Sequence, residues 1–345
     1  TTLFRSKPGK ALFVFVALLI SNFALSQDAD LMQRAQQDDP IAQSELGFIY
    51  ATGEGVTQDY AEALHWILLA AEQGNSDAQY NYGNMFANGF GVSQNFAEAL
   101  LWYRKAAAQS HARAQFNLGF MYDNAQGVAQ DYTEAARWYG AAAELGNAAA
   151  QNNLGYMFKY GLGVRQDYAE ALRWLQLAAA QGYPSAEFNL GAMYSNGTGV
   201  ERDLVIAEKW YQLAAQRGHL AAQLSLADML SADAPEGQSK EQRGEQRQQE
   251  RQAQAARWYL AAAQQGDAEA QYKLGELYEL GYGVPQNHEL AFMWTHIAVA
   301  LANDTLRSRV VRNRDTIGRQ LAPDQLQRAQ DLAQRCLDSG YTSCN

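Results

Sequence analysis

Histidines are the first residues in this chain that could do chemistry, and their spacing fits no metal or acid–base site. The five histidines are His65, His111, His219, His288 and His296. None belongs to a His-Glu-x-x-His pattern, which would place two metal-binding imidazoles on one face of a helix. His288 and His296 are eight residues apart on one predicted helix and could share a face. We interpret them as unrelated side chains.

The motifs of common nucleophilic and nucleotide-binding sites are also missing. The sequence contains no Gly-x-Ser-x-Gly and no Ser-x-x-Lys, the signatures of serine acyl transfer. Segments such as Gly161-Leu-Gly163-Val164 lack the third glycine and the preceding strand of a dinucleotide-binding loop. The repeated carboxylates Glu62, Glu98, Glu134 and Glu170 each follow an Asp or Asn by three residues, which is the spacing of a capping box. We therefore predict no enzyme activity, no cofactor and no metal.

Two kinds of residue recur with one period along most of the chain. Trp66, Trp102, Trp138, Trp174 and Trp210 are 36 residues apart, Trp258 follows after 48, and Trp294 after another 36. A small residue repeats with the same period and the same slip, at Gly47, Gly83, Gly119, Gly155, Gly191, Ala227 and Gly275. A fixed period near 36 residues is typical of a solenoid of stacked repeats.

The copy between Asn147 and Gly182 explains the repeating unit. Its first half places Ala150, Leu154, Met157 and Phe158 on one face of a helix. Gly161 and Gly163 then supply the positive φ angles of a tight turn. A second helix begins at Asp167 and ends at Gly182. One such hairpin cannot bury its apolar face alone, so we expect neighbouring hairpins to stack.

The pattern A-x-x-x-L-G-x-M-Y, G-x-G-V-x-Q-D-Y-x-E-A-x-x-W and A-A-x-x-G resembles the Sel-one-like repeat (SLR), a relative of the tetratricopeptide repeat. The resemblance covers residues 39–302, with repeats at 39–74, 75–110, 111–146, 147–182, 183–218, 219–266 and 267–302. It implies an all-α, right-handed α-solenoid that serves as a protein-interaction scaffold and not as an enzyme. We expect residues 27–38 to cap the array at one end. Residues 303–345 are expected to form a helical pair that caps the other end.

The sixth repeat departs from the others because a polar segment, residues 231–252, replaces its Gly-x-Gly-Val turn. This segment has almost no apolar residues and mixes charges of both signs. One interpretation is a solvated loop with a helical extension running into Trp258. The other is an insertion that binds a specific partner, because insertions in repeat proteins fall in loops.

Residues 1–26 have the features of a secretory signal peptide. Arg5, Lys7 and Lys10 precede the apolar run ALFVFVALLI, and Ala24-Leu25-Ser26 resembles a cleavage site. We expect cleavage near Ser26/Gln27 and a periplasmic or secreted protein, with an uncleaved N-terminal anchor as the alternative. The only two cysteines, Cys336 and Cys344, would then form a disulfide.

The net negative charge of the chain limits the kinds of partner that it is expected to bind. The chain carries 27 basic and 37 acidic residues, a formal net charge of −10. Without the three basic residues of the leader, 24 basic against 37 acidic residues give −13. Such a protein is not expected to bind nucleic acid or an anionic membrane. We expect a monomer that, once the leader is cleaved, does not insert into a membrane and prefers a neutral or basic protein or peptide.

The resemblance places the binding surface on the first helix of each repeat, which lines the concave face in tetratricopeptide arrays. An asparagine recurs there at Asn81, Asn117, Asn153 and Asn189. It could bind a peptide, or it could join neighbouring helices. Exposed aromatic candidates are Phe48, Phe120 and Tyr156 at one position and Tyr160 one turn further on. For a second aromatic row, Tyr80, Phe116, Phe188 and Tyr272, the inter-repeat core and the groove are equally open.

These residues predict a non-catalytic scaffold that binds a peptide or protein in the bacterial envelope. Two alternatives remain open at this point. One is a regulator that binds an envelope enzyme through the same surface and adjusts its activity. The other is a hydrolase that acts on peptidoglycan or β-lactams. The missing nucleophile motif and metal cluster count against the hydrolase.

Overall fold

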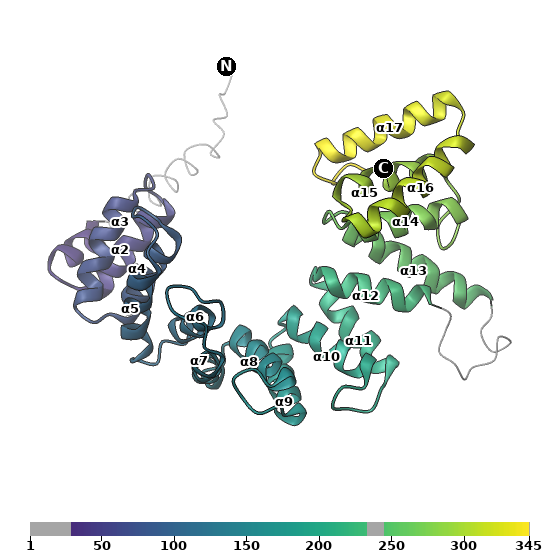
Figure 1. Ribbon diagram of the computed structural model, residues 1–345. Helices are drawn as coiled ribbons and strands as arrows, with labels where there is room; N and C mark the ends of the chain where they lie inside the picture. Colours follow the sequence, from purple (N-terminus) through teal and green to yellow (C-terminus); the bar gives the residue numbers. More distant parts are fainter. Residues whose placement is uncertain (1–28, 233–244, 345) are drawn as a thin grey trace, which may run out of the picture. The chain divides into compact units, whose positions relative to one another are not determined.

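The structure is a computed structural model that describes residues 29–232 and 245–344 (Figure 1). Within those ranges every regular element is an α-helix, and the first helix spans residues 29–36. No helix in those ranges is long and apolar enough to cross a membrane. The predicted signal peptide, residues 1–26, lies outside the described residues.

Seven helical hairpins follow within the described ranges. Their first helices, the A helices, are α2 (Pro40–Thr52), α4 (Ser76–Asn88), α6 (Ala112–Asp123), α8 (Ala148–Tyr160), α10 (Pro184–Asn196), α12 (Leu220–Ser231) and α14 (Ala268–Leu280). Their second helices, the B helices, are α3 (Tyr60–Glu72), α5 (Phe96–Ala107), α7 (Tyr132–Glu144), α9 (Tyr168–Ala180), α11 (Leu204–Gln216), α13 (Glu245–Ala263) and α15 (His288–Leu301). B helices contact the next A helix at α3–α4, α5–α6, α7–α8, α11–α12 and α13–α14. The predicted α-solenoid of stacked hairpins is therefore confirmed.

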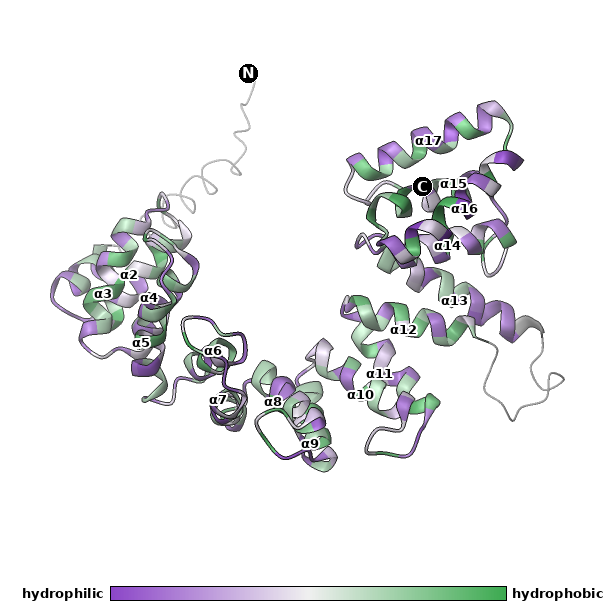
Figure 2. Cartoon of the chain, in the orientation of Figure 1, coloured by the Kyte–Doolittle hydropathy of each residue, from purple (hydrophilic) through white to green (hydrophobic). Residues whose placement is uncertain are grey.

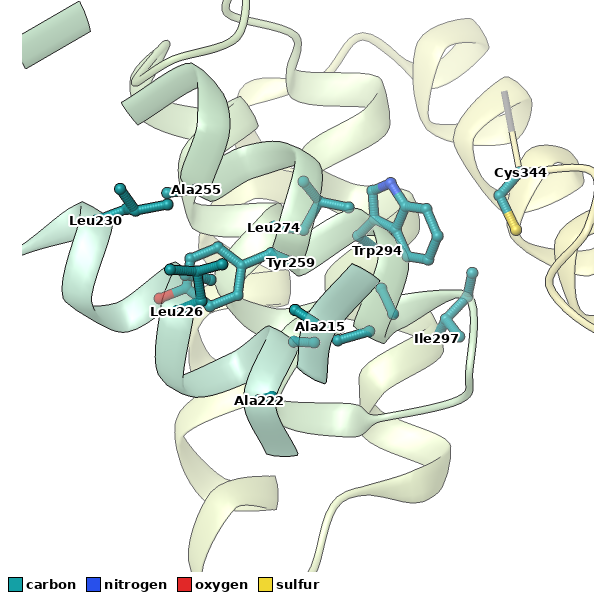
Figure 3. Packing of buried hydrophobic residues seen from close by; sticks show 14 of the residues in the cluster. Ala215, Ala222, Leu226, Leu230, Ala255, Tyr259, Leu274, Trp294, Ile297 and Cys344 are labelled. Atoms are coloured by element: carbon teal, nitrogen blue, oxygen red, sulfur yellow. The ribbon is translucent and has the colours of Figure 1, made fainter. Parts of the chain in front are cut away.

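The chain divides into two compact units, residues 1–174 and 175–345, with the boundary inside α9. In the first unit, small buried clusters between successive hairpins form around Tyr103 and Tyr139. In the second unit, Leu226, Tyr259 and Trp294 belong to one larger cluster, part of which Figure 3 shows. Each unit thus has a core built from both helices of successive hairpins.

In every repeat but the sixth, an aspartate or asparagine closes the hairpin at the start of the B helix. The Asp59 carboxylate accepts hydrogen bonds from the N–H groups of Ala61 (2.8 Å) and Glu62 (3.1 Å). The Asp59 N–H donates to the carbonyl of Tyr50 in the A helix (2.9 Å). The same pair of contacts recurs at Asn95, Asp131 and Asp167. The predicted capping box is therefore wrong in its second half, because the A helix already uses the N–H that the glutamate would accept.

The small residue of the periodic ladder lets the two helices of a hairpin approach closely. A Cβ on Gly119 would lie 2.6 Å from the ring of Tyr139 in the B helix. A Cβ on Gly191 would lie equally close to the ring of Tyr211. Contacts that short are not tolerated between real side chains, so the glycine is fixed by packing of the hairpin.

The two glycines of the turn have different roles. Gly161 ends α8 in the left-handed region, at φ 71°. Gly163 has φ 65°, and a Cβ on it would also collide with the backbone of Tyr132 in the preceding B helix. In the first repeat, a Cβ on Gly55 would meet nothing within 4 Å. The second glycine thus allows the turn of one repeat to pack on the repeat before it.

In every repeat but the fifth, a buried glutamine at the fourth residue of the A helix joins the hairpin to the helix before it. Its Nε2 donates to the backbone carbonyl of the residue eight positions earlier, over 3.0–3.3 Å, at Gln43, Gln79, Gln115, Gln151, Gln223 and Gln271. Carbonyl groups in the last turn of a helix have no acceptor role within that helix. The carbonyl also accepts a backbone N–H from three residues further on, as Ala107 does from Ser110 (3.0 Å), so the glutamine amide is a second donor that comes from the next hairpin. The contact gives the buried amide of the glutamine its own hydrogen-bond partner.

The side-chain oxygen of this glutamine accepts a hydrogen bond from a second glutamine near the end of the B helix. Gln73 donates to the Oε1 of Gln43 (2.8 Å), and Gln109 donates to that of Gln79 (2.9 Å). In the third repeat the donor is replaced by Leu145, whose side chain is half exposed. The buried Oε1 of Gln115 there has no hydrogen-bond donor among the described residues. The seventh repeat is the same: Leu301 stands at the donor position, and the buried Oε1 of Gln271 has no hydrogen-bond donor among the described residues.

The fifth repeat replaces both amides by charged groups. Glu187 stands where the other repeats have the buried glutamine, and Arg217 stands at the donor position. The Arg217 Nε lies 3.2 Å from Oε1 of Glu187, whose side chain is only 2% exposed. The ion pair thus occupies the place of the amide pair at this junction.

In the sixth repeat, α12 ends at Ser231 and α13 begins at Glu245. Residues 245–252 of the predicted insertion are therefore helical and extend the B helix, as the first interpretation expects. This extension is hydrophilic (Figure 2), and Arg251 in it pairs with Glu208 (3.3 Å). Residues 233–244 lie outside the described part of the chain.

Two further helices cover the last hairpin, α16 (Asp304–Gln320) and α17 (Pro323–Asp338). Both pack against α15. Cys336 in α17 forms a disulfide with Cys344, and both side chains are buried in the core of the second unit. The expected helical cap and its disulfide are present in the structure.

Histidine serves as the N-terminal cap of two A helices. His219 Nδ1 accepts the backbone N–H of Ala222 (3.2 Å) at the start of α12, and its ring stacks on Phe188. A ring nitrogen that accepts a hydrogen bond carries no proton, so this contact requires a neutral imidazole with its proton on Nε2. Burial also lowers the pKa of His219. The folded chain therefore prefers neutral His219.

Leu145→Gln should stabilise the protein. The new amide would donate to the unpaired Oε1 of Gln115 and would remove an exposed leucine, for a gain of about 1 kcal/mol in the free energy of unfolding. The reverse change in the neighbouring repeat, Gln109→Leu, should lower the free energy of unfolding by a similar amount, because it leaves the Oε1 of Gln79 without its donor. Thermal or urea unfolding measures both. A Leu145→Gln protein no more stable than the parent would contradict this account of the glutamine pairs.

Stability should fall as the pH drops through the ordinary histidine pKa of about 6.5. The pKa of His219 is lowered in the folded state, so the unfolded chain binds the proton first, and protonation favours unfolding. His219→Asn keeps a capping side chain, as Asn75 and Asn147 do in sister repeats, and removes the titration. Unfolding measured between pH 7 and 5 should be less pH-dependent in this variant, by at most about 1.4 kcal/mol per pH unit. Equal slopes would refute the role of His219.

Candidate functional site

Four aromatic side chains stand exposed on the A helices of the first unit. Phe48 is 51% exposed, Phe120 41%, Tyr156 44% and Tyr160 51%. The rings of Tyr156 and Tyr160 lie on one face of α8, with centroids 4.5 Å apart. Large aromatic rings left in water on a folded surface indicate a binding site more often than single exposed aliphatic side chains do. We call these four residues the aromatic face.

The second aromatic row is part of the core between repeats. Tyr80, Phe116 and Phe188 are half-buried, and Tyr272 is buried. Each of the first three packs against a tyrosine of its own B helix, with ring centroids 5.6–5.9 Å apart. Of the two readings left open by the sequence, the structure thus favours the core.

Two of the predicted asparagines, Asn117 and Asn153, are held by tyrosine hydroxyls. Asn117 Nδ2 donates to Oδ1 of Asn84 in the preceding repeat (3.3 Å). The hydroxyl of Tyr103 donates to the same oxygen (2.6 Å) and also hydrogen-bonds Asn117. Burial raises the pKa of Tyr103, so the hydroxyl keeps its proton and remains a donor. Asn117 therefore joins two repeats.

The other three asparagines differ in their partners. Asn153 hydrogen-bonds the hydroxyl of Tyr139 and accepts from Nδ2 of Asn152 (3.1 Å). Asn189 is half-buried and has polar contacts of its own. Asn81 is half-buried, and its side chain makes no hydrogen bond within the described ranges. The reason is that Ile67, which has no hydroxyl, replaces the tyrosine in the first repeat.

The tyrosine hydroxyls were not among the residues that the sequence analysis singled out. Tyr103, Tyr139, Tyr211 and Tyr259 share one position of the B helix, and each is buried. Their hydroxyls reach polar side chains of the A helices, such as Asp228 for Tyr259 (2.5 Å). Their 36-residue recurrence is visible in the sequence, but the hydroxyl contacts depend on how closely the hairpin packs.

The surface around the aromatic face is polar and almost balanced in charge. Exposed amides flank it at Asn88 and Asn124. An ammonium group belongs to the face itself, since Nζ of Lys159 in α8 lies 5.0 Å from the ring centroid of Tyr160. Other ionised groups on A helices of these repeats are Asp77, which contacts His111 Nε2 (3.0 Å), Arg113 and Asp123. Aromatic rings and amides together suit a polypeptide, since they offer both apolar contact and hydrogen bonds to a main chain.

Comparisons with known proteins agree with the repeat architecture. The Sel1 repeat family model matches residues 40–75, 76–111, 112–147, 148–183, 184–219, 243–267 and 268–303. These matches begin one residue after the repeats defined from the sequence, except in the sixth repeat, where the match starts at residue 243. No match is found among the curated proteins.

Two solved structures are similar over most of the chain. A Sel1 repeat protein from Oxalobacter formigenes is 30% identical, with a TM-score of 0.66, over 89% of this chain and 82% of its own. The protein c5321, described as a protective antigen of uropathogenic Escherichia coli with an SLR fold, is 28% identical, with a TM-score of 0.57, over 90% of this chain and 80% of its own. Repeats of this kind generally mediate protein–protein interaction on a scaffold that is typically non-catalytic. The chain belongs to the Sel1 repeat family.

Proposed function

We propose that the protein binds a partner polypeptide on the aromatic face of its first unit and has no catalytic activity of its own. The observation that carries this proposal is the exposure of Phe120, Tyr156 and Tyr160, each more than 40% accessible. By contrast, Phe116 on the same helix as Phe120 is half-buried against Tyr139. The rings lie on rigid A helices that the buried glutamines and tyrosines hold in place. A preformed surface loses little conformational freedom when it binds.

The chemistry of the face indicates how the partner is recognised. The tilted pair Tyr156 and Tyr160 offers two rings and two hydroxyls to an apolar side chain and to main-chain groups. Asn81 has an amide that the hairpin packing does not use. An extended or helical segment of low charge would satisfy these groups. Asn117 and Asn153 serve chiefly to position the A helices, and we assign them no direct contact.

We further propose that the protein acts in the bacterial envelope. The support is the signal-peptide pattern in residues 1–26 together with the cysteine pair at Cys336 and Cys344. Disulfides persist in oxidising compartments such as the periplasm and are rare in the cytosol.

The decisive experiment uses the full chain as bait in crosslinked envelope extract from its host. Tyr156→Ser combined with Tyr160→Ser should lose the captured partner, by at least tenfold in affinity, which is about 1.4 kcal/mol. The loss is expected because both rings are exposed and leave no cavity, so the melting temperature should stay near that of the parent. Tyr282→Ser is the matched control, since Tyr282 is equally exposed (51%) but lies in a turn.

The outcomes separate clearly. A protein captured by the parent and by the Tyr282 variant, and lost with the Tyr156/Tyr160 pair, supports the aromatic face as the binding surface. Capture that is indifferent to the pair would refute it. Turnover of a muropeptide or β-lactam by the purified chain, abolished by one substitution, would replace the scaffold with an enzyme.

A further inference from the structure

A hollow on the B-helix side of the first unit is a second, separate feature of the surface. It measures about 670 Å³ and lies between α7 and α9, above Leu154 and Phe158 of α8. Gly140 forms part of its wall in the middle of α7. The aromatic face lies on the A helices, so the proposed function does not use this hollow.

Packing does not account for Gly140. A glycine inside a helix is unfavourable relative to almost any other residue, because it gains no contacts and loses more backbone freedom. A Cβ on Gly140 would meet nothing within 4 Å, whereas the ladder glycine of the same hairpin, Gly119, is required by the ring of Tyr139. Its effect is therefore to leave the hollow open.

Sister repeats show which side chains fill this place. In the first repeat the equivalent residue is Leu68, which packs against the core between the first two hairpins. In the second repeat it is Arg104, whose Nη2 donates to the hydroxyl of Tyr122 in the next A helix (2.7 Å). In the third repeat Gly140 replaces the arginine, and Phe158 replaces the tyrosine. The arginine and its acceptor are thus lost together.

The charges that line the hollow balance, and one carboxylate among them is left for a cation. Four ionised groups line it, at Arg137, Glu144, Glu170 and Arg173. Both arginines are already engaged: Arg137 pairs with Glu134 and stacks on Trp138, and Arg173 pairs with Glu170 and stacks on Trp174.

Glu144 is different. It is exposed, makes no ion pair or hydrogen bond within the described ranges, and lies one helical turn beyond Gly140 on the same face of α7. The chain as a whole has a formal net charge of −10.

We propose that the hollow binds an arginine side chain of a basic partner segment, in the place that Arg104 takes in the preceding repeat. The aliphatic part of the arginine packs over Gly140 and against Phe158, whose ring face also attracts the guanidinium. The carboxylate of Glu144 replaces the lost tyrosine hydroxyl as the acceptor. The interaction fits the acidic character of the chain.

The probe for this site is a phage-displayed library of 12-residue peptides, selected on the full chain and counter-selected on Gly140→Leu. The leucine fills the hollow as Leu68 does in the first repeat, and it improves helix propensity, so this variant should melt at or above the parent's temperature. The selected peptides should share an arginine. Replacing that arginine by citrulline, its neutral isostere, should weaken binding at least tenfold.

Variants of the protein complete the test. Gly140→Leu should weaken the selected peptide at least tenfold, and Glu144→Gln about fivefold. Glu72→Gln is the matched control, because Glu72 holds the same repeat position beside the filled site of Leu68, and it should change nothing. Tyr156→Ala should also leave the peptide bound, which separates this site from the aromatic face.

Three results would overturn the proposal. They are a selection that yields no peptide sensitive to Gly140→Leu, binding unchanged by citrulline, and tighter binding when leucine replaces the arginine. Peptides lost with Tyr156→Ala but not with Gly140→Leu would refute the hollow and leave the proposed function standing.

Discussion

The junction between hairpins depends on one buried hydrogen bond that a hairpin cannot make alone. The glutamine of an A helix, Gln79 for example, reaches back to a carbonyl at the end of the preceding helix. The glutamine amide is buried, so it would be costly if left without this acceptor. The bond also fixes the offset between the two helices. The contact of the Tyr103 hydroxyl with Asn117 of the next hairpin crosses the same junction and depends on that offset. Stacking is therefore specified by polar geometry as well as by apolar burial.

The architecture was predictable because the sequence repeats with a fixed period and marks the ends of its helices with capping residues and glycines. The 36-residue spacing of tryptophans and small residues located every hairpin, and the second helix of the fourth repeat begins after Asp167, where it was expected. The capping boxes were misjudged at Asp59 and its sister residues, because sequence spacing cannot show that an N–H is already bound by another helix. The long helix of the sixth repeat was only one of two interpretations, since residues 245–252 lack an apolar period.

The contacts of the candidate-site residues were harder to predict from the sequence than the fold. Helical periodicity separates a buried from an exposed position on one helix, and on that basis Phe120 and Tyr156 were expected at the surface. It does not show which groups a side chain touches across a junction. Asn117 and Asn153 therefore had two interpretations, and only the position of Tyr103 and Tyr139 gives their bonding. Gly140 was not singled out from the sequence, because its lack of a side chain is informative only when it is compared with Leu68 and Arg104 at the same repeat position.

The turn glycines have a consequence for how the chain is made. Gly163 packs against the backbone of Tyr132, and Gly91 packs against Tyr60, so each turn rests on a helix that lies earlier in the sequence. Gly55, in the first hairpin, requires no such support. During synthesis the ribosome releases the N-terminal hairpin first, and every later hairpin emerges beside a surface that is already complete. The turn of each later hairpin can therefore pack, in the order of translation, on a helix that has already been made.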